Sequence, residues 1–202
     1  MARAPARRAP AAPTAQSQVV RRARILRAAA QLGATRGYDG VQMQDVAKKA
    51  GVALGTLYRY FPSKTQLFLA VMAEEVFDRA PDGRHHQGAE RRGDVADLLI
   101  GWTKRFTQRP RLALVMVQST LAAYANQSAE ARGMDLLAAP DILGRLGIDR
   151  PSEEDLGKVR LLTYAWWGIV IARLSGHLTQ AQAEAHIRMG AALVLAPMRE
   201  PV

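Results

Sequence analysis

Apolar residues recur at helical spacing along almost the whole chain, and no segment shows the alternation of a β-strand. The first stripe consists of Ile25, Ala28, Ala29 and Leu32, which follow an i, i+3, i+4, i+7 pattern and precede Gly37, a residue that commonly ends helices. Because the same period continues to the end of the chain, the sequence predicts an all-α fold.

Three further helices are predicted before residue 80. One stripe covers 43–50 and ends at Gly51, and the next covers 54–61 and ends before Pro62. Ser63 followed by Gln66 matches a capping box, so the fourth helix is predicted to start there.

A polar, glycine-rich segment at 80–93 predicts a loop or hinge, and more helices follow it. Their expected ranges are 94–108, 111–126, 134–146, 152–175 and 179–196. The pairs Ser152 with Asp155 and Thr179 with Gln182 mark two of the starts. The predicted organisation is a disordered basic arm at 1–18, a helix-turn-helix domain at 19–64 and a larger helical domain at 65–202.

The net positive charge of the chain lies entirely in its first third. Residues 1–72 contain twelve Lys or Arg and two acidic residues, a net charge of +10, whereas residues 73–202 contain sixteen of each sign. This asymmetry is typical of a module that binds a polyanion and is joined to a neutral body. A merely solubilising surface is the alternative interpretation of the charge.

The segment GVALGTLYRYFPSK at 51–64 lies within this positively charged third and predicts a helix-turn-helix. A short helix, a glycine-containing turn and a second short helix form the helix-turn-helix unit. On a helical wheel Leu54, Leu57 and Phe61 fall within about 60° of one another, which predicts an anchoring face.

The opposite arc of the same helix presents chemistry suited to nucleic acid. It carries Gly55, Thr56, Arg59 and Tyr60, with Tyr58 at its flank. Hydroxyl and guanidinium donors reach phosphates and base edges, and the glycine allows the backbone to approach closely. Lys64, in the first turn of the next helix, is placed to favour a phosphate. We therefore predict DNA binding.

The run from Arg24 to Met72 resembles the TetR family of bacterial transcriptional regulators, and the resemblance is carried by GVALGTLYRYFPSK. It implies a three-helix DNA-binding domain whose third helix enters the major groove, followed by a larger all-helical regulatory domain. The contacts it implies are phosphate contacts by Thr56, Tyr58 and Tyr60, base or phosphate contacts by Gln44 and Arg59, a phosphate clamp at Lys64 and a close approach at Gly55.

The segment departs from the family pattern in two places. Val41-Gln42-Met43 stands where a Thr or Ser usually caps the second helix, so the phosphate contact made there is left open. Leu54 replaces a commonly polar residue, and it either belongs to the core or touches a thymine methyl group as a DNA-binding residue. The VQM and VALGTLYRYFPSK segments look most like repressors of sterol (cholesterol) catabolism.

The neutral body offers large and adaptable side chains on predicted helices. The candidate ligand-binding residues are Trp102, Phe106, Met116, Thr120, Tyr124 and Trp166. Such residues suit an apolar pocket with a few polar groups, and ordinary core packing is the alternative for each of them. His177 and His186 lack metal-ligand spacing, and no catalytic motif is present, so no metal, no cofactor and no enzymatic activity are expected.

The last two helices predict a dimer. From Val159 to Leu174 apolar residues occur on nearly every side of the wheel, so this helix needs a partner on two sides. The following helix carries a narrow stripe with a small residue for close packing. The candidate interface residues are Trp167, Ile187, Gly190 and Val194.

Together these patterns predict a cytoplasmic homodimer that represses transcription at a palindromic operator and is released by a small apolar effector. The effector class suggested by the resemblance is a sterol-derived acid or an acyl-CoA-like molecule. A sequence-neutral, nucleoid-type protein that coats DNA is the alternative.

Overall fold

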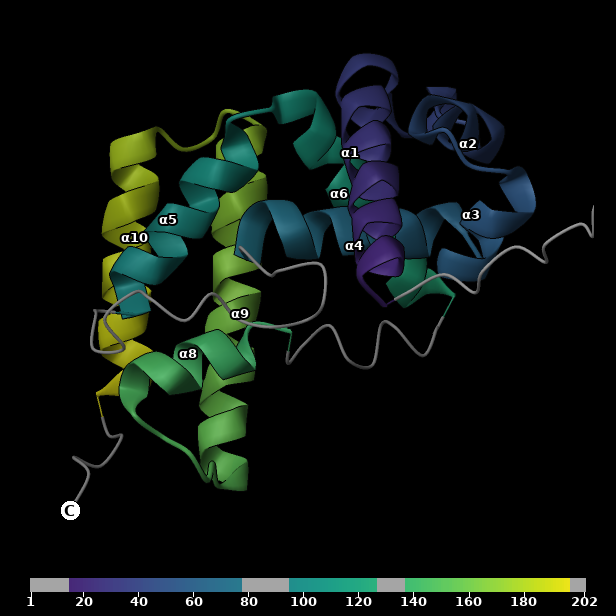
Figure 1. The fold of residues 1–202 in the computed structure, drawn as a ribbon. Helices are drawn as coiled ribbons and strands as arrows, with labels where there is room; N and C mark the ends of the chain where they lie inside the picture. The colour runs from purple at the N-terminus through teal and green to yellow at the C-terminus, as the bar shows by residue number, and fades with distance from the viewer. Residues whose placement is uncertain (1–14, 78–94, 127–136, 197–202) are drawn as a thin grey trace, which may run out of the picture.

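The computed structural model describes residues 15–77, 95–126 and 137–196, and within these ranges the secondary structure is helical (Figure 1). The first group of helices is α1 (Ala15–Gly40), α2 (Met43–Ala50), α3 (Leu54–Tyr60) and α4 (Lys64–Phe77). The second group is α5 (Val95–Thr107), α6 (Pro110–Ala125), α8 (Ala139–Leu146), α9 (Glu153–Leu174) and α10 (Gln180–Leu195). The all-α prediction is confirmed.

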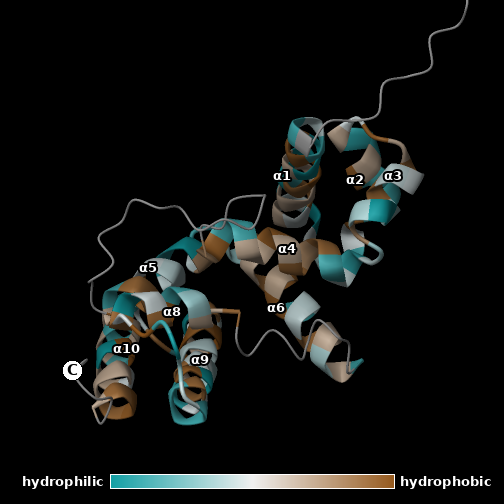
Figure 2. Cartoon of the chain, turned by 60° about the horizontal axis from the view of Figure 1, so that its bottom comes forward, coloured by the Kyte–Doolittle hydropathy of each residue, from teal (hydrophilic) through white to brown (hydrophobic). Residues whose placement is uncertain are grey.

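Two clusters of helices lie at opposite ends of the molecule. Helices α1, α2 and α3 cluster at one end, while α5, α8, α9 and α10 form the other (Figures 1 and 2). Helices α4 and α6 lie between them, and both pack against α1. This places the predicted DNA-binding helices away from α9 and α10.

The first helix differs from the prediction at its start. Helix α1 begins at Ala15, so residues 15–18, which we assigned to a disordered arm, are helical. The reason is local, because Pro13 is the last proline of the arm and the following Ala, Gln and Ser residues all accept helical backbone angles. Residues 1–14 lie outside the described ranges. The range of α1 runs to Gly40, but the backbone of Gly37 is not helical, with φ 72° and ψ 179°. The regular helix therefore ends at Gly37, as predicted, and a kink follows.

Helix α8 is shorter than expected. The prediction was 134–146, but residues 137 and 138 form a turn and the helix begins at Ala139. Pro140 lies in its first turn, where a missing backbone N–H removes no helical hydrogen bond. Residues 134–136 and the predicted loop at 80–93 lie outside the described ranges.

Two of the three predicted capping boxes are confirmed at the starts of α9 and α10, and at the start of α4 the Gln66 amide donates to Ser63 Oγ at 3.1 Å. The Asp155 amide donates to Ser152 Oγ at 3.2 Å, and the Gln182 amide donates to Thr179 Oγ1 at 3.2 Å. Hydrogen bonds from Ser152 lower the pKa of the Asp155 carboxyl, since they stabilise its ionised form.

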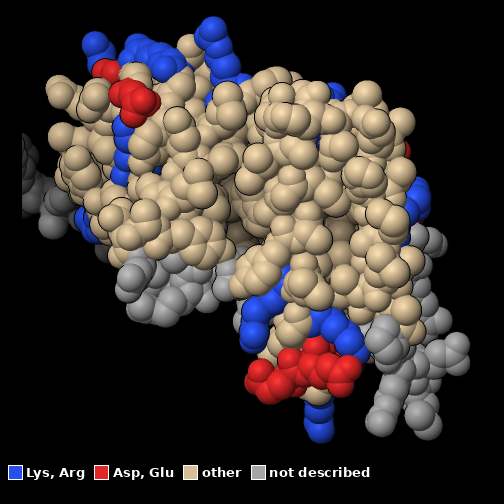
Figure 3. All heavy atoms as spheres, turned by 180° about the vertical axis from the view of Figure 1, so that it is seen from behind, with Lys and Arg blue, Asp and Glu red and all other residues tan. Residues whose placement is uncertain are grey.

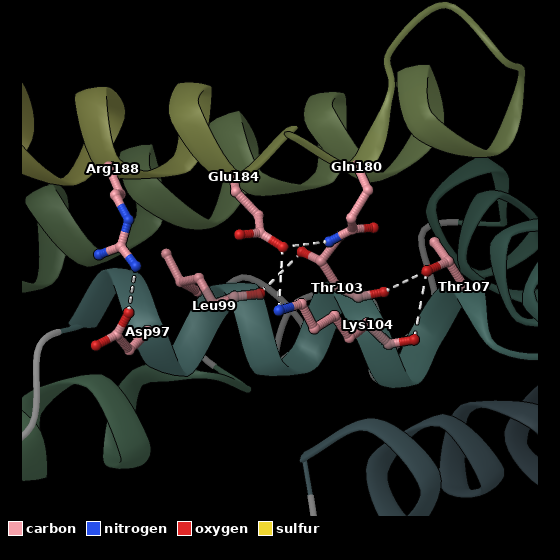
Figure 4. Close-up of polar contacts among 8 residues, drawn as sticks. All are labelled: Asp97, Leu99, Thr103, Lys104, Thr107, Gln180, Glu184 and Arg188. Atoms are coloured by element: carbon pink, nitrogen blue, oxygen red, sulfur yellow. Dashed lines mark hydrogen bonds and ion pairs between the residues drawn. The ribbon is translucent and has the colours of Figure 1, made fainter. Parts of the chain in front are cut away.

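Helices α5 and α10 are joined by a line of polar contacts on their exposed sides (Figure 4). Arg188 Nη2 lies 2.7 Å from Asp97 Oδ1, and Lys104 Nζ lies 3.0 Å from Glu184 Oε1. Gln180 Nε2 donates to the same Glu184 oxygen at 2.9 Å. The pKa of the Glu184 carboxyl is lowered, mainly by the hydrogen bond from Gln180 and to a smaller extent by the contact with Lys104.

The two ends of the molecule meet where α1 crosses α4 and α6, and this crossing depends on Gly33. A Cβ atom at Gly33 would lie 2.9 Å from Cε1 of Phe68 and 3.1 Å from Cδ1 of Leu112. Both of those side chains are fully buried. Any side chain at position 33 therefore competes with the packing of α4 and α6.

A matched pair of glycine substitutions tests this packing. Gly101→Ala in α5 meets no atom within 4 Å, so it should raise the free energy of unfolding by up to about 1 kcal/mol through helix propensity alone. Gly33→Ala should instead lower it by about 1–3 kcal/mol, because the buried Phe68 ring has to move. Urea unfolding of both variants provides the measurement, and equal gains in stability would contradict the close packing at Gly33.

Candidate functional site

The turn between α2 and α3 is built around Gly51. Its backbone is left-handed, with φ 64° and ψ 42°, and its N–H donates to the carbonyls of Ala47 and Lys48. Val52 N donates to Ala47 O at 3.0 Å. A glycine adopts this conformation without strain, so the turn predicted from the sequence is confirmed.

Helix α3 is held by one face and exposed on the other. Leu57 is 0% exposed and Phe61, which follows the helix, is also buried. Leu54 is 39% exposed and Tyr58 45%. The predicted anchor of three residues is therefore wrong for Leu54: at the first position of the helix its side chain lies outside the core, where a DNA contact remains open to it.

The predicted contact residues of α3 form one continuous surface. Gly55 and Arg59 are exposed beside Leu54 and Tyr58, while Thr56 and Tyr60 are half-buried. A Cβ at Gly55 would meet nothing within 4 Å, so this position lies open to an approaching backbone.

Helix α2 contributes the exposed Gln44. Its N-cap residue Gln42 makes no side-chain capping bond, which is the departure noted in the sequence. The first-turn amides of α2 therefore lack the Thr or Ser hydroxyl that usually serves them.

Lys64 has a position that the sequence did not reveal. Its Nζ donates to Tyr38 O at 2.8 Å and to Val41 O at 3.3 Å, and it lies 4.2 Å from the centroid of the Tyr38 ring. Tyr38 Oη and Thr65 Oγ1 lie 3.2 Å apart. The ammonium group thus ties the α1–α2 connection to the start of α4, and two of its three donors are engaged within the protein.

Charged contacts fix α1 against its neighbours. Arg36 Nη1 lies 2.6 Å from Asp45 Oδ2 on α2, and Arg22 Nη1 lies 3.9 Å from Glu74 Oε2 on α4. Burial raises the pKa of the Glu74 carboxyl, and the Arg22 charge opposes that rise. These pairs position α2 and α4 relative to α1, and sequence reasoning missed them because residues 9 or 52 positions apart share no recognisable pattern.

Five of the six predicted ligand-binding residues are buried in the body, and ring contacts connect three of them. Trp102, Phe106, Met116, Thr120 and Trp166 are buried, whereas Tyr124 is 41% exposed. The Trp166 ring centroid lies 5.9 Å from that of Trp102 and 6.3 Å from that of Phe106, in edge-to-face contacts. These aromatic side chains therefore form one connected cluster from α5 and α9, and Tyr124 lies outside the buried set.

Four buried hydroxyl groups of the body bond to their own helices, and one of them contacts the aromatic cluster. Thr103, Ser119, Thr120 and Thr163 each donate to the carbonyl four residues earlier. Trp166 Nε1 donates to Thr103 Oγ1 at 2.9 Å. The hydroxyl donors are satisfied, but threonine and serine oxygens keep acceptor capacity for another polar group.

The predicted interface residues divide into two groups. Ile187 is 1% exposed and belongs to the core of its own chain, so the structure removes it from the contact face. Gly190, Val194 and Trp167 are half-buried, and the Trp167 ring packs 5.5 Å from that of Phe106. Helical periodicity could not separate Ile187 from the others, because it does not show which side of α10 faces α9.

Within the described ranges no group of three acidic, His or Cys side chains could hold a metal ion. The described helices also include none that is long and apolar enough to cross a membrane.

His177, which the sequence did not assign to a metal site, makes a local contact at the end of α9, where its Nδ1 lies 2.8 Å from Ser175 Oγ.

Comparisons with known proteins match both ends of the chain. The family described as "Bacterial regulatory proteins, tetR family" matches residues 25–71, and "Tetracyclin repressor-like, C-terminal domain" matches residues 88–194, more than half of the chain. The HTH-type transcriptional repressor KstR of Rhodococcus jostii is 32% identical over 163 residues, which cover 80% of this chain and 76% of the relative. The protein of the same name from Mycolicibacterium smegmatis is 28% identical over 190 residues, 92% of each chain.

A solved structure agrees with these relatives. A TetR transcriptional regulator from Rhodococcus sp. RHA1 matches with a TM-score of 0.78 and 38% identity, covering 89% of this chain and 99% of that one. The resemblance predicted from GVALGTLYRYFPSK is confirmed. The chain belongs to the tetR family of bacterial regulatory proteins, and it is a transcriptional regulator that binds DNA through its helix-turn-helix.

Proposed function

We propose that this regulator is a repressor that binds a near-palindromic operator as a homodimer and leaves it when a small apolar effector binds the body. The observation that carries the proposal is the division of α3, which is anchored by Leu57 and Phe61 and presents Leu54, Tyr58 and Arg59 outward. The relatives named KstR are repressors, which supports the direction of control.

The alternative, a protein that coats DNA without sequence preference, has less support. A coating protein needs only distributed positive charge, whereas α3 combines a guanidinium, hydroxyls and an apolar side chain on one exposed surface. In a dimer two such helices would meet major grooves at least one helical turn apart, roughly 34–36 Å. Footprinting should show a protected palindrome and not uniform protection.

Arg59→Ala and Lys64→Ala separate DNA contact from domain stability. Arg59→Ala should weaken specific operator binding by about 1–3 kcal/mol if the guanidinium reads a base, and it should leave unfolding unchanged because the side chain is exposed. Lys64→Ala should lower the free energy of unfolding by about 1–3 kcal/mol through its lost charged hydrogen bonds. If Lys64 also keeps a phosphate contact, the slope of log affinity against log salt should fall by about 1.

The readouts are operator titration at several salt concentrations and urea unfolding. Arg150 is an exposed arginine just before α9, and Arg150→Ala is the matched control for the loss of one positive charge. Wild-type operator affinity for Arg59→Ala would contradict the proposed docking of α3.

The proposed dimer rests on the exposed apolar side chains of α9 and α10. Leu161, Tyr164 and Ile171 recur at helical spacing on α9, and Met189 and Leu193 do so on α10, where Leu193 is 72% exposed. The two helices lie side by side (Figures 1 and 2). Seen from behind, charged side chains gather at two ends of the molecule and leave uncharged surface between them (Figure 3). Two such helices from each chain would form a four-helix contact.

Gly190 makes this contact testable without disturbing one chain. A Cβ at Gly190 would meet no atom within 4 Å, so the protomer accommodates the first side-chain atom there, and Gly190→Leu is expected to clash with a partner. Gly190→Leu and Leu193→Glu should both give monomers in sedimentation and lower operator affinity at least about a hundredfold, because a single half-site loses the advantage of linked binding. Leu121→Glu, at a position of α6 that is also more than half exposed, should remain dimeric. Intact dimers for both test variants would place the interface elsewhere.

The proposed effector is a bulky apolar molecule with a few polar groups, of the class of a sterol-derived acid or its coenzyme A thioester. The support is the aromatic cluster of Trp102, Phe106 and Trp166, the buried hydroxyls of α6, and the resemblance of the VQM and VALGTLYRYFPSK segments to repressors of sterol catabolism. The proposed lining consists of Trp102, Phe106, Met116, Thr120, Tyr124 and Trp166.

A displacement in the body would reach the DNA-binding helices through α6. Leu112 packs at Gly33 of α1, Arg111 Nη1 donates to Thr35 O at 3.3 Å, and Arg109 pairs with Glu75 of α4. A ligand that displaces α6 therefore acts on α1 and α4 directly. It can shift the DNA-binding equilibrium only by its difference in affinity for the two shapes.

Calorimetry tests the effector and its coupling together. Candidate sterol acids and their thioesters should bind wild-type protein, and operator DNA should weaken that binding by about 5- to 150-fold, the usual range of allosteric coupling. The ligand must weaken operator binding by the same factor, since coupling is reciprocal. Equal ligand affinities with and without operator, for every ligand that binds, would exclude the inducer mechanism.

A further inference from the structure

Helix α1 begins before the segment that the family model matches. The family match begins at Ile25, whereas α1 begins at Ala15, ten residues earlier. This extension does not project freely, because Arg22 fixes it on two sides. The Arg22 guanidinium carbon lies 5.6 Å from the centroid of the Phe61 ring at the end of α3, and its Nη1 lies 3.9 Å from Glu74 Oε2 on α4.

The anchored extension forms a cleft with the recognition helix. The cleft has a volume of about 370 Å³, and its described lining consists of Gln18 and Arg21 from α1 and Arg59 and Tyr60 from α3. Two guanidinium groups, an amide and a phenol therefore face one space. No acidic side chain belongs to this described lining, and neither arginine forms an ion pair with another described residue.

This combination of groups matches a phosphate. Two like charges beside a cleft repel each other unless an anion lies between them, and guanidinium forks donate to phosphate oxygens in pairs. Gln18 and Tyr60 supply further donors. Because Arg59 lies on the helix that enters the groove, an anion in this cleft would belong to the DNA that α3 contacts.

We infer that Arg21 is a DNA-binding residue which, together with Arg59, grips one backbone phosphate of the operator in the cleft between α1 and α3. The inference rests on the proposed operator binding. It adds a contact from the first turns of α1, which carry Arg21 to the same cleft as Arg59 of α3.

Arg24 supplies a matched control on the same helix. It is exposed, and it lines a separate cleft of about 210 Å³ with Arg27 and Lys49 at the far end of α2. Arg21→Ala should weaken operator binding about tenfold near physiological salt and lower the salt slope by about 0.9, the value for one lost phosphate contact. Arg24→Ala removes the same charge from a different cleft, so the phosphate assigned to Arg21 should remain in contact with the protein in that variant. Arg21→Lys should restore most of the slope, and all variants should keep wild-type thermal unfolding.

Ethylation interference identifies the phosphate itself. Ethylating one particular phosphate in each half-site should weaken the wild-type complex and should not weaken the Arg21→Ala complex further. If ethylating that phosphate weakened the Arg21→Ala and Arg24→Ala complexes alike, Arg21 would not be its contact, and this result would overturn the inference. So would wild-type operator affinity for Arg21→Ala combined with an Arg21-dependent rise in unfolding temperature on adding inorganic phosphate, because the cleft would then hold a free anion.

The wild-type titration separates this inference from the proposed function. If wild-type protein protects no palindrome, operator binding itself fails. If it protects one and Arg21→Ala behaves like Arg24→Ala in ethylation interference, only the role of Arg21 fails.

Discussion

The packing of Phe68 and Leu112 against Gly33 joins the two ends of this molecule. At this crossing α1 approaches α4 and α6 so closely that even a methyl group at position 33 would meet the Phe68 ring at 2.9 Å. Close-packed interiors transmit displacement because they contain no space to absorb it. The crossing therefore makes the position of the DNA-binding helices depend on the position of α6.

Helix α3 shows the same dependence on its surroundings. A helix of seven residues is too short to persist alone in water, so its conformation is imposed by the contacts of Leu57 and Phe61 and by the turn at Gly51. Lys64 and Tyr38 then bind the preceding connection to α4. The surface offered to DNA is consequently rigid, and its groups need little ordering when an operator arrives.

The basic residues of the DNA-binding end divide into two roles. Arg22, Arg36 and Lys64 make contacts inside the protein, with Glu74, Asp45 and backbone carbonyls. Arg21 and Arg59 face a cleft whose described lining contains no opposing charge. The net charge of +10 in residues 1–72 already subtracts Asp45, whereas Glu74 lies outside that range and offsets the charge of Arg22. The charge of Lys64 is not cancelled by the carbonyls, but it is held within the protein.

The sequence by itself determined the helical class, most helix boundaries and the location of the recognition helix. Glycines at 37 and 51, the capping pairs at 152 and 179, and the pattern of 51–64 act over a few residues, and such local signals can be read directly. Only the tertiary structure decided which side of each helix is covered. It placed Leu54 outside, Ile187 inside, Lys64 on two carbonyls and Arg21 beside Arg59. These outcomes depend on contacts between residues far apart in the chain, and helical periodicity specifies a face without specifying what packs against it.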